Sequence, residues 1–85
     1  MEKIKLKLKN KTGLHARPAS KVVDVAKQYS SEIEVERNDK KVNAKSLLSI
    51  LSLGADCGDE IKIIASGGDE KKAIIELENV IKDFK

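Results

Sequence analysis

Aromatic residues are nearly absent from this chain, whose 85 residues include one tyrosine, one phenylalanine and no tryptophan. Sheets that bind single-stranded nucleic acid stack bases on aromatic rings, so this scarcity argues against that class of protein. Tyr29 and Phe84 also fall at the expected ends of helices rather than on strands. We therefore predict no nucleic-acid partner, although a basic chain that alternates strands and helices could form a sheet of the RNA-recognition type.

Cysteine and histidine are equally scarce, with one of each. A lone cysteine forms no internal disulfide, and Cys57 has no second thiol or histidine near it in sequence to build a zinc site. We interpret this thiol as incidental and predict neither a metal nor a cofactor. Paired carboxylates with a cleft signature and nucleotide-binding glycine loops are missing as well, which disfavours a free-standing enzyme.

Long hydrophobic runs are missing because charged residues interrupt every apolar stretch. No segment could span a membrane, and the N-terminus lacks the apolar core of a signal peptide, so we expect a cytoplasmic protein without membrane insertion. A hydrophobic fraction of 40% and a charged fraction of 36% are ordinary for a folded domain. We predict one domain over residues 1–85, acting as a monomer.

The net charge of +3 is unevenly distributed along the chain. Residues 1–45 carry twelve lysines and arginines against six acidic residues, whereas residues 46–85 carry five against eight. The first half is therefore basic and the second acidic. Such asymmetry permits electrostatic steering towards acidic protein partners, but a lysine-rich surface is more often simply solvated.

Two periodicities divide the chain into secondary-structure elements. Alternation of apolar and charged residues predicts strands at residues 3–9, 32–36, 41–43 and 60–65. Apolar residues at three- and four-residue spacing predict helices from Ala16 to Gln28, from Leu47 to Leu53, and after Asp69 towards Phe84. Ser46 and Asp69 are expected to cap the second and third helices, and Gly54 to end the second.

The predicted order is therefore βαββαβα. Strands with one polar face need all the helices on the other face, which gives an α/β (α+β) fold with a single core. We predict an open-faced two-layer sandwich, with a four-stranded sheet covered on one face by three helices.

His15 lies where the first strand pattern gives way to the first helix pattern. A helix start offers unpaired backbone N–H groups and the positive end of the helix dipole, here at Ala16, and Pro18 fits the first helical turn. Arg17 adds a planar cationic donor. This setting suits an imidazole that carries a phosphoryl group, although a lone histidine at a helix start is most often a solvated cap or loop residue.

The sequence resembles the histidine-containing phosphocarrier family HPr of the phosphoenolpyruvate-dependent sugar phosphotransferase system, of the Gram-positive type. The resemblance covers essentially the whole chain and rests on the runs Gly13–Ala19, Val42–Ser46 and Leu51–Gly54. It implies that enzyme I phosphorylates Nδ1 of His15, that Arg17 stabilises the phosphate, and that sugar-specific enzyme IIA proteins accept the phosphoryl group. It also implies an antiparallel sheet of strand order 1-4-2-3, and a transfer intermediate rather than an enzyme.

Ser46 has a structural role as a helix cap that needs no regulation. The resemblance adds phosphorylation of Ser46 by HPr kinase/phosphorylase and binding of the phosphoserine form to the catabolite control repressor. It also implies that Leu47, Leu48 and Leu51 form an apolar docking patch, where the family commonly has isoleucine and methionine. These leucines could instead be core residues, because a short helix over a sheet needs about that many anchors.

A regulatory HPr-like protein, acting in carbon-catabolite or nitrogen signalling without sugar flux, is the alternative function. His15 argues against a version that lacks a phosphorylatable histidine. The Lys45-Ser46 pair is more typical of the carbon-linked type than of the nitrogen-linked one.

Overall fold

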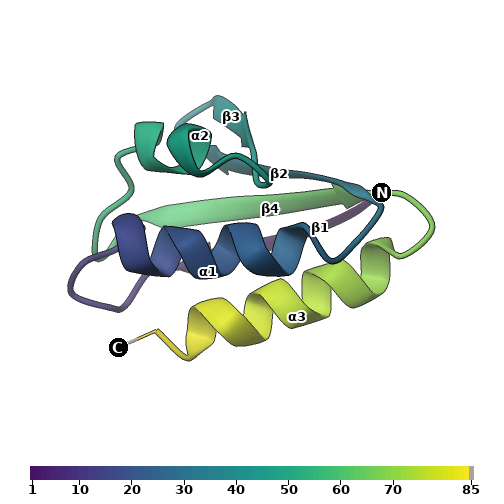
Figure 1. The fold of residues 1–85 in the computed structure, drawn as a ribbon. Helices are drawn as coiled ribbons and strands as arrows, with labels where there is room; N and C mark the ends of the chain where they lie inside the picture. The colour runs from purple at the N-terminus through teal and green to yellow at the C-terminus, as the bar shows by residue number, and fades with distance from the viewer. Residues whose placement is uncertain (85) are drawn as a thin grey trace.

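The computed structural model describes residues 1–84, which form one antiparallel sheet and three helices (Figure 1). The strands and helices follow the predicted order. They are β1 (Glu2–Lys7), α1 (Ala16–Ala26), β2 (Glu32–Arg37), β3 (Lys40–Asn43), α2 (Leu47–Ser52), β4 (Glu60–Ser66) and α3 (Glu70–Lys82). The strand order in the sheet is β1-β4-β2-β3, which confirms the order that the family resemblance implied.

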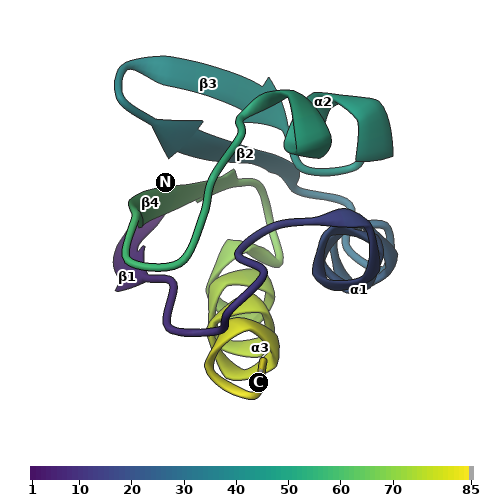
Figure 2. The same ribbon diagram turned by 90° about the vertical axis from the view of Figure 1, so that its left-hand side faces the viewer.

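All three helices lie on one face of the sheet, as Figure 2 shows when the sheet is viewed from its side. The core fills the space between the layers, and its largest fully buried apolar side chains come from strands, helices and one loop. They are Leu8, Val22, Ile33, Val35, Ile50, Ile61, Ile63 and Leu77. On the other face, Lys3, Lys5 and Lys7 are exposed. The predicted open-faced sandwich is confirmed.

The pairing of β1 with β4 determines which loops meet. Their register places Lys7 opposite Glu60, so the loop that follows β1 and the turn that precedes β4 lie at the same end of the sheet. The N–H of Leu8 donates to Asp59 O (2.9 Å), and the N–H of Gly58 donates to Leu8 O (2.7 Å). Two segments far apart in sequence are thereby held side by side.

Helix α1 ends at Ala26, two residues before the predicted end at Gln28. The N–H of Gln28 donates to Val25 O (3.0 Å) and that of Tyr29 donates to Ala26 O (3.2 Å). These bonds reach back three residues rather than four, so the last turn tightens out of α-helical geometry. The apolar periodicity continues past this point and could not indicate the change.

Asp69 occupies the N-cap position of α3 as predicted, but its side chain makes no capping hydrogen bond in the described part of the chain. Within residues 1–84 its carboxylate binds the segment after α1 instead of the helix N–H groups. It accepts from the N–H groups of Ser30 (2.9 Å) and Ser31 (3.0 Å), and from both hydroxyls. Asp69 thus has four donors from this segment, and two of them belong to the fully buried Ser31. Asp69 thus ties the end of α1 to the start of α3.

Acid titration should reveal this tie. Hydrogen bonds from Ser31, and then from Ser30, lower the pKa of Asp69 from 3.8 to about 2. Because the pKa in the folded protein is depressed, the ionised carboxylate stabilises the fold above about pH 4, and this contribution disappears as the pH falls through about 2. For Asp69→Asn we expect a lower free energy of unfolding at pH 7 and a shallower loss of stability between these pH values.

Urea unfolding at a series of pH values measures this effect. Asp24→Asn removes an exposed carboxylate from the surface of α1 and serves as the control. If the free energies of unfolding of Asp69→Asn and the parent protein vary with pH in parallel, the expected role of Asp69 is contradicted.

Candidate functional site

His15 is the N-cap residue of α1, with an extended backbone (φ −75°, ψ −176°). Its carbonyl accepts the first intrahelical bond, from the N–H of Ala19 (2.8 Å). Its side chain is 66% exposed and, among the described residues, accepts no capping bond from the helix. The imidazole is therefore accessible to another protein while its backbone is fixed by the helix.

The first turn of α1 offers groups that suit an anion. Helical geometry leaves the N–H groups of Ala16 and Arg17 without intrahelical acceptors, and Pro18 has no N–H to satisfy. Ala16 and Arg17 are exposed and Pro18 is half-buried. The partial positive charge of the helix start and the guanidinium of Arg17 act in the same place. The structure thus brings together His15 and the three residues predicted to support a phosphate.

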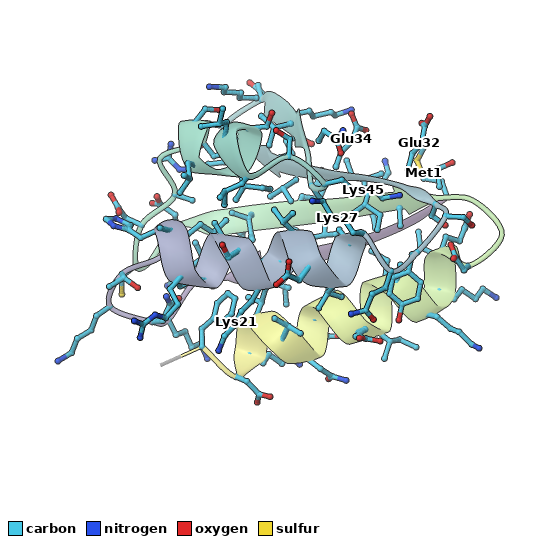
Figure 3. All side chains as sticks on the ribbon, viewed as in Figure 1. Met1, Lys21, Lys27, Glu32, Glu34 and Lys45 are labelled. Carbon is cyan, nitrogen blue, oxygen red and sulfur yellow. The ribbon has the colours of Figure 1, made fainter. Side chains whose placement is uncertain are left out.

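A hollow beside His15 extends this cationic surface. It is lined by Thr12, His15, Ala16, Arg17, Pro18, Lys21, Asp83 and Phe84. Lys21 projects from α1 on the side that faces the C-terminal end of α3 (Figure 3). Sequence reasoning missed Lys21, although its place one helical turn after Arg17 indicates that the two share a face.

The loop before His15 is held against the turn before β4. The N–H of Leu14 donates to Ala55 O (2.9 Å), and the side chain of Asn10 donates to Gly13 O (2.8 Å). Gly13 has φ +57°, and a Cβ there would lie 2.4 Å from Ala55 O. Only glycine allows the two backbones to come this close.

This close approach brings Asp56 to the imidazole. Nε2 of His15 lies 3.3 Å from Oδ1 of Asp56, whose side chain is 70% exposed. Sequence reasoning missed Asp56, which is 41 residues away from His15. The antiparallel pairing of the first strand with the strand after residue 59 could have indicated that the two loops meet, but not which side chains touch.

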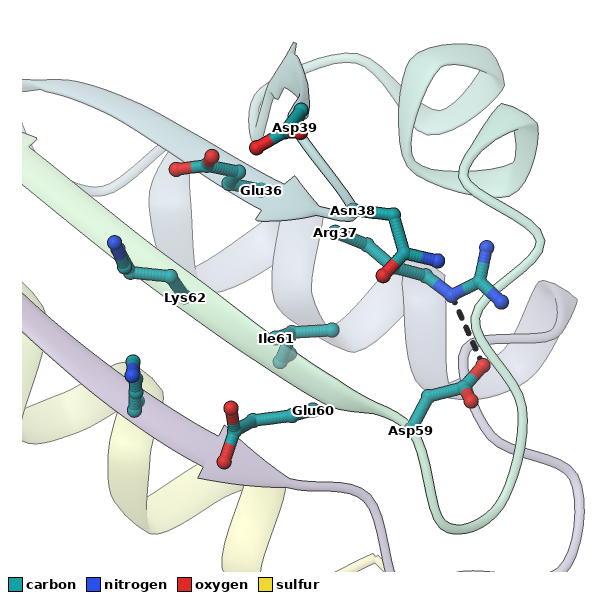
Figure 4. Close-up of a pocket in the computed structure, with 9 residues that line it drawn as sticks. Glu36, Arg37, Asn38, Asp39, Asp59, Glu60, Ile61 and Lys62 are labelled. Carbon is teal, nitrogen blue, oxygen red and sulfur yellow. Dashed lines mark hydrogen bonds and ion pairs between the residues drawn. The ribbon is translucent and has the colours of Figure 1, made fainter.

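The turn that carries Asp56 is itself braced. The N–H of Asp56 donates to Oδ2 of Asp59 (2.8 Å), and Nε of Arg37 donates to the same oxygen (2.9 Å), as Figure 4 shows for the Arg37–Asp59 pair. Nη1 of Arg37 also donates to Leu53 O (3.1 Å). The bond from Asp56, followed by the charge of Arg37, lowers the pKa of Asp59, so the brace stays ionised near neutral pH.

Ser46 caps α2 as predicted. Its Oγ accepts from the N–H of Ser49 (3.3 Å), and its carbonyl accepts from the N–H of Ile50 (3.0 Å). Ser46 is half-buried. The capping bond satisfies one N–H at the helix start and stabilises α2 by about 1 kcal/mol.

The leucines of α2 divide between the surface and the core. Leu48 is 81% exposed and Leu47 is 37% exposed, whereas Leu51 is half-buried against the core. Ile50 and Leu53 are the buried anchors of this segment. Two of the three predicted docking residues are therefore available to a partner, and α2 lies alongside the N-terminal half of α1 (Figure 1).

Two features of other protein classes do not occur in the described part of the chain. Residues 1–84 contain no helix long and apolar enough to cross a membrane. They also contain no group of three or more histidine, cysteine, aspartate or glutamate side chains that could hold a metal ion.

Known proteins resemble this chain over nearly its whole length. The HPr-like protein Crh of Bacillus subtilis is 39% identical over 79 residues, which cover 93% of either protein. The crystal structure of HPr-C-His from Thermoanaerobacter tengcongensis is 49% identical and superposes with a TM-score of 0.94, covering 96% of this chain and 92% of that one. Phosphocarrier protein HPr from Bacillus anthracis is 34% identical, with a TM-score of 0.89 and coverages of 94% and 95%.

The solved structures include dimers of two of these relatives. One is a dimer of the T. tengcongensis HPr, and another is a dimer of Crh described as having a swapping domain. The monomeric state expected for this chain therefore stays a prediction.

A model of the family described as "PTS HPr component phosphorylation site" matches residues 2–83, which include both His15 and Ser46. Together with the fold and the relatives at 34–49% identity, this match shows that the chain belongs to the HPr family of the phosphotransferase system.

Proposed function

We propose that this protein relays a phosphoryl group from phospho-enzyme I to sugar-specific enzyme IIA proteins through His15. The observation that carries the proposal is an exposed imidazole at the N-cap of α1, beside Arg17 and the N–H groups of the first helical turn. An accessible nucleophile next to donors for an anion is what a phosphoryl carrier needs.

The transfer step follows from the chemistry of a neutral imidazole. The lone pair on Nδ1, the nitrogen implied by the family resemblance, attacks the phosphorus of the donor as the bond from phosphorus to the donor breaks. The guanidinium of Arg17 and the N–H of Ala16 hold the phosphoryl oxygens. Because these groups are exposed, they stabilise the phosphoryl group without enclosing it, and the next acceptor can reach it.

The partners supply the rest of the catalytic machinery. Around His15 the chain offers the imidazole, two cationic side chains, the carboxylates of Asp56 and Asp83, and backbone donors. We therefore assign the protein to the phosphoryl-transfer intermediates rather than to the enzymes. The scarcity of aromatic side chains, with Tyr29 and Phe84 both packed against the core, supports protein partners over nucleic acid.

Intact-mass spectrometry after incubation with phosphoenolpyruvate, Mg²⁺ and enzyme I tests the carrier function. We expect a gain of one phosphoryl group that is lost in acid and kept in alkali, as for a phosphoimidazole. Omission of phosphoenolpyruvate is the control. No gain with an enzyme I that phosphorylates another HPr would overturn the proposal.

We further propose that Ser46 is a regulatory phosphorylation site, modified by HPr kinase/phosphorylase, and that the modified protein binds the catabolite control repressor. Ser46 begins α2, where the helix dipole stabilises a phosphate. The same phosphate adds negative charge next to the exposed Leu47 and Leu48. Phosphorylation therefore changes the proposed docking surface for enzyme I with little change in the fold.

Ser46→Asp is expected to slow phosphoryl acceptance from enzyme I by about tenfold or more, because a carboxylate in the docking surface is repelled or must be desolvated. Ser46→Ala is the matched control, since it loses the capping side chain without adding charge. The rate of phosphorylation at limiting enzyme I measures the effect. Equal rates for Ser46→Asp and the parent would count against a regulatory role based on charge.

The alternative, a regulatory HPr-like protein without sugar flux, is favoured by the 39% identity to Crh. Phosphorylation of Ser46 by the kinase together with no phosphorylation of His15 would select this alternative. Phosphorylation at both residues would support the carrier with its regulation.

A further inference from the structure

The contact between His15 and Asp56 favours one position for the hydrogen of the imidazole ring. Oδ1 of Asp56 lies 3.3 Å from Nε2 of His15. An ionised carboxylate can only accept hydrogen bonds, so Nε2 must be the donor in this pair. In a neutral ring the lone pair then resides on Nδ1.

Backbone contacts bring the segments that carry His15 and Asp56 together. The close approach at Gly13 and the bond from Leu14 to Ala55 place the two backbones together. The bond from the N–H of Asp56 to Asp59, which Arg37 also binds, orients the turn that presents the carboxylate. Both ends of the His15–Asp56 pair are therefore fixed at the backbone.

We propose that Asp56 is a positioning residue, which holds His15 in the Nε2–H tautomer and serves as the counterion of the ring when Nδ1 carries a phosphoryl group. The counterion role rests on the proposed function, whereas the tautomer assignment does not. Asp56 contacts Nε2, on the opposite side of the ring from Nδ1. It therefore acts through His15 and leaves the attacking nitrogen free.

The proton balance of the transfer explains why such a residue is useful. When neutral Nδ1 attacks phosphorus, the N–P bond forms, the bond to the donor breaks, and the ring becomes a cation that still carries hydrogen on Nε2. When the phosphoryl group leaves, the electron pair of the N–P bond returns to Nδ1 and the ring is neutral again. No proton is gained or lost at His15 in either direction, provided that Nε2–H is the starting tautomer.

The charges around His15 make a counterion more valuable. Arg17 and Lys21 are both cationic groups in the hollow beside the ring, and a further positive charge on the imidazole is repelled by them. Asp83 lines the same hollow from the end of α3, but the carboxylate at hydrogen-bond distance from the ring is that of Asp56. Asp56 therefore offsets the charge that develops during transfer.

Nitrogen NMR of the unphosphorylated protein tests the tautomer directly, since His15 is the only histidine. At a pH high enough for a neutral ring, we expect the ratio of Nε2–H to Nδ1–H tautomers to fall about fivefold in Asp56→Ala. Asp56→Asn keeps an acceptor oxygen and should show a smaller fall. Asp24→Asn removes a carboxylate from the surface of α1 and is expected to leave the ratio unchanged.

An unchanged ratio in Asp56→Ala would overturn the proposal, and so would an equal fall in Asp24→Asn, which would indicate an effect of net charge. Asp56 is exposed, so its side chain can be removed without opening the core. A thermal unfolding curve that coincides with that of the parent protein verifies this for each variant.

The rate of phosphoryl acceptance from enzyme I tests the role of Asp56 as a counterion. We expect a rate about tenfold lower in Asp56→Ala, with Asp56→Asn between it and the parent, because the charge-assisted bond to the cationic ring is lost in steps. A shifted tautomer ratio with an unchanged rate would overturn the role of Asp56 in transfer. If Asp56→Ala shifts the tautomer ratio but the parent protein is never phosphorylated, the carrier function is refuted. The tautomer assignment then still stands.

Discussion

Replacing His15 by alanine is expected to lower phosphoryl acceptance from enzyme I by at least about 10³-fold, to the level of the reaction without a carrier. The sequence contains no second histidine, so no other imidazole can take over the phosphoryl group. Arg17 and the helix start remain in His15→Ala, but they bind anions and supply no nucleophile. The loss should therefore be in the chemical step itself.

The stability of His15→Ala should be close to that of the parent protein, which separates loss of chemistry from loss of fold. The side chain of His15 is 66% exposed, and its removal opens no cavity. Lys11→Ala removes another exposed side chain from the same loop and is expected to accept the phosphoryl group normally. Intact-mass spectra in acid and alkali measure acceptance, and an acid-labile phosphoryl group on His15→Ala would contradict the assignment of His15.

The elements and the centre of the site could be predicted because their signals are local. Alternating lysines mark β1, and the helical spacing of valines and alanines marks α1. The Pro18 ring favours a helix start just before it, and α1 begins at the predicted residue, Ala16. The cap at Ser46 also depends only on residues one helical turn apart.

The side-chain hydrogen bonds of Asp56 and Asp69, which sequence reasoning missed, join distant segments. Asp56 meets His15 only because β1 and β4 pair and the loop at Gly13 fits against the turn. Asp69 satisfies the statistical preference for a helix cap, yet its carboxylate binds Ser30 and Ser31 across the fold. A local pattern specifies which residue type stands at a position, whereas the partner of a polar side chain is decided by which donors the tertiary fold brings near.

Gly13→Ala is expected to have the largest effect on stability among single substitutions near the site, lowering the free energy of unfolding by about 3 kcal/mol or more. Two costs add. A residue with a side chain is strained at φ +57°, which costs about 1–2 kcal/mol. The new Cβ would also lie 2.4 Å from Ala55 O and 2.5 Å from Asp56 Cα, which are both backbone atoms that cannot rotate away.

Gly54→Ala separates the two costs. Gly54 has nearly the same backbone conformation, with φ +63°, but nothing lies within 4 Å of an added Cβ. Gly54→Ala should therefore lower the free energy of unfolding by only about 1 kcal/mol, which is the conformational cost alone. Since about 1 kcal/mol shifts the melting temperature of a domain of this size by about 4–8 °C, we expect a drop of roughly 15 °C or more for Gly13→Ala and about a third of that for Gly54→Ala.

Thermal and urea unfolding of the two variants measure these differences, and equal destabilisation would show that the close approach at Gly13 contributes nothing. The approach matters for function as well as for stability. Any relief of the clash must move the loop before His15 away from the turn that carries Asp56, so folded Gly13→Ala should also show the altered tautomer ratio expected of Asp56→Ala. A glycine without a reactive group thus determines the geometry of the imidazole two residues later, because the distance between two backbones sets the distance between the side chains that they carry.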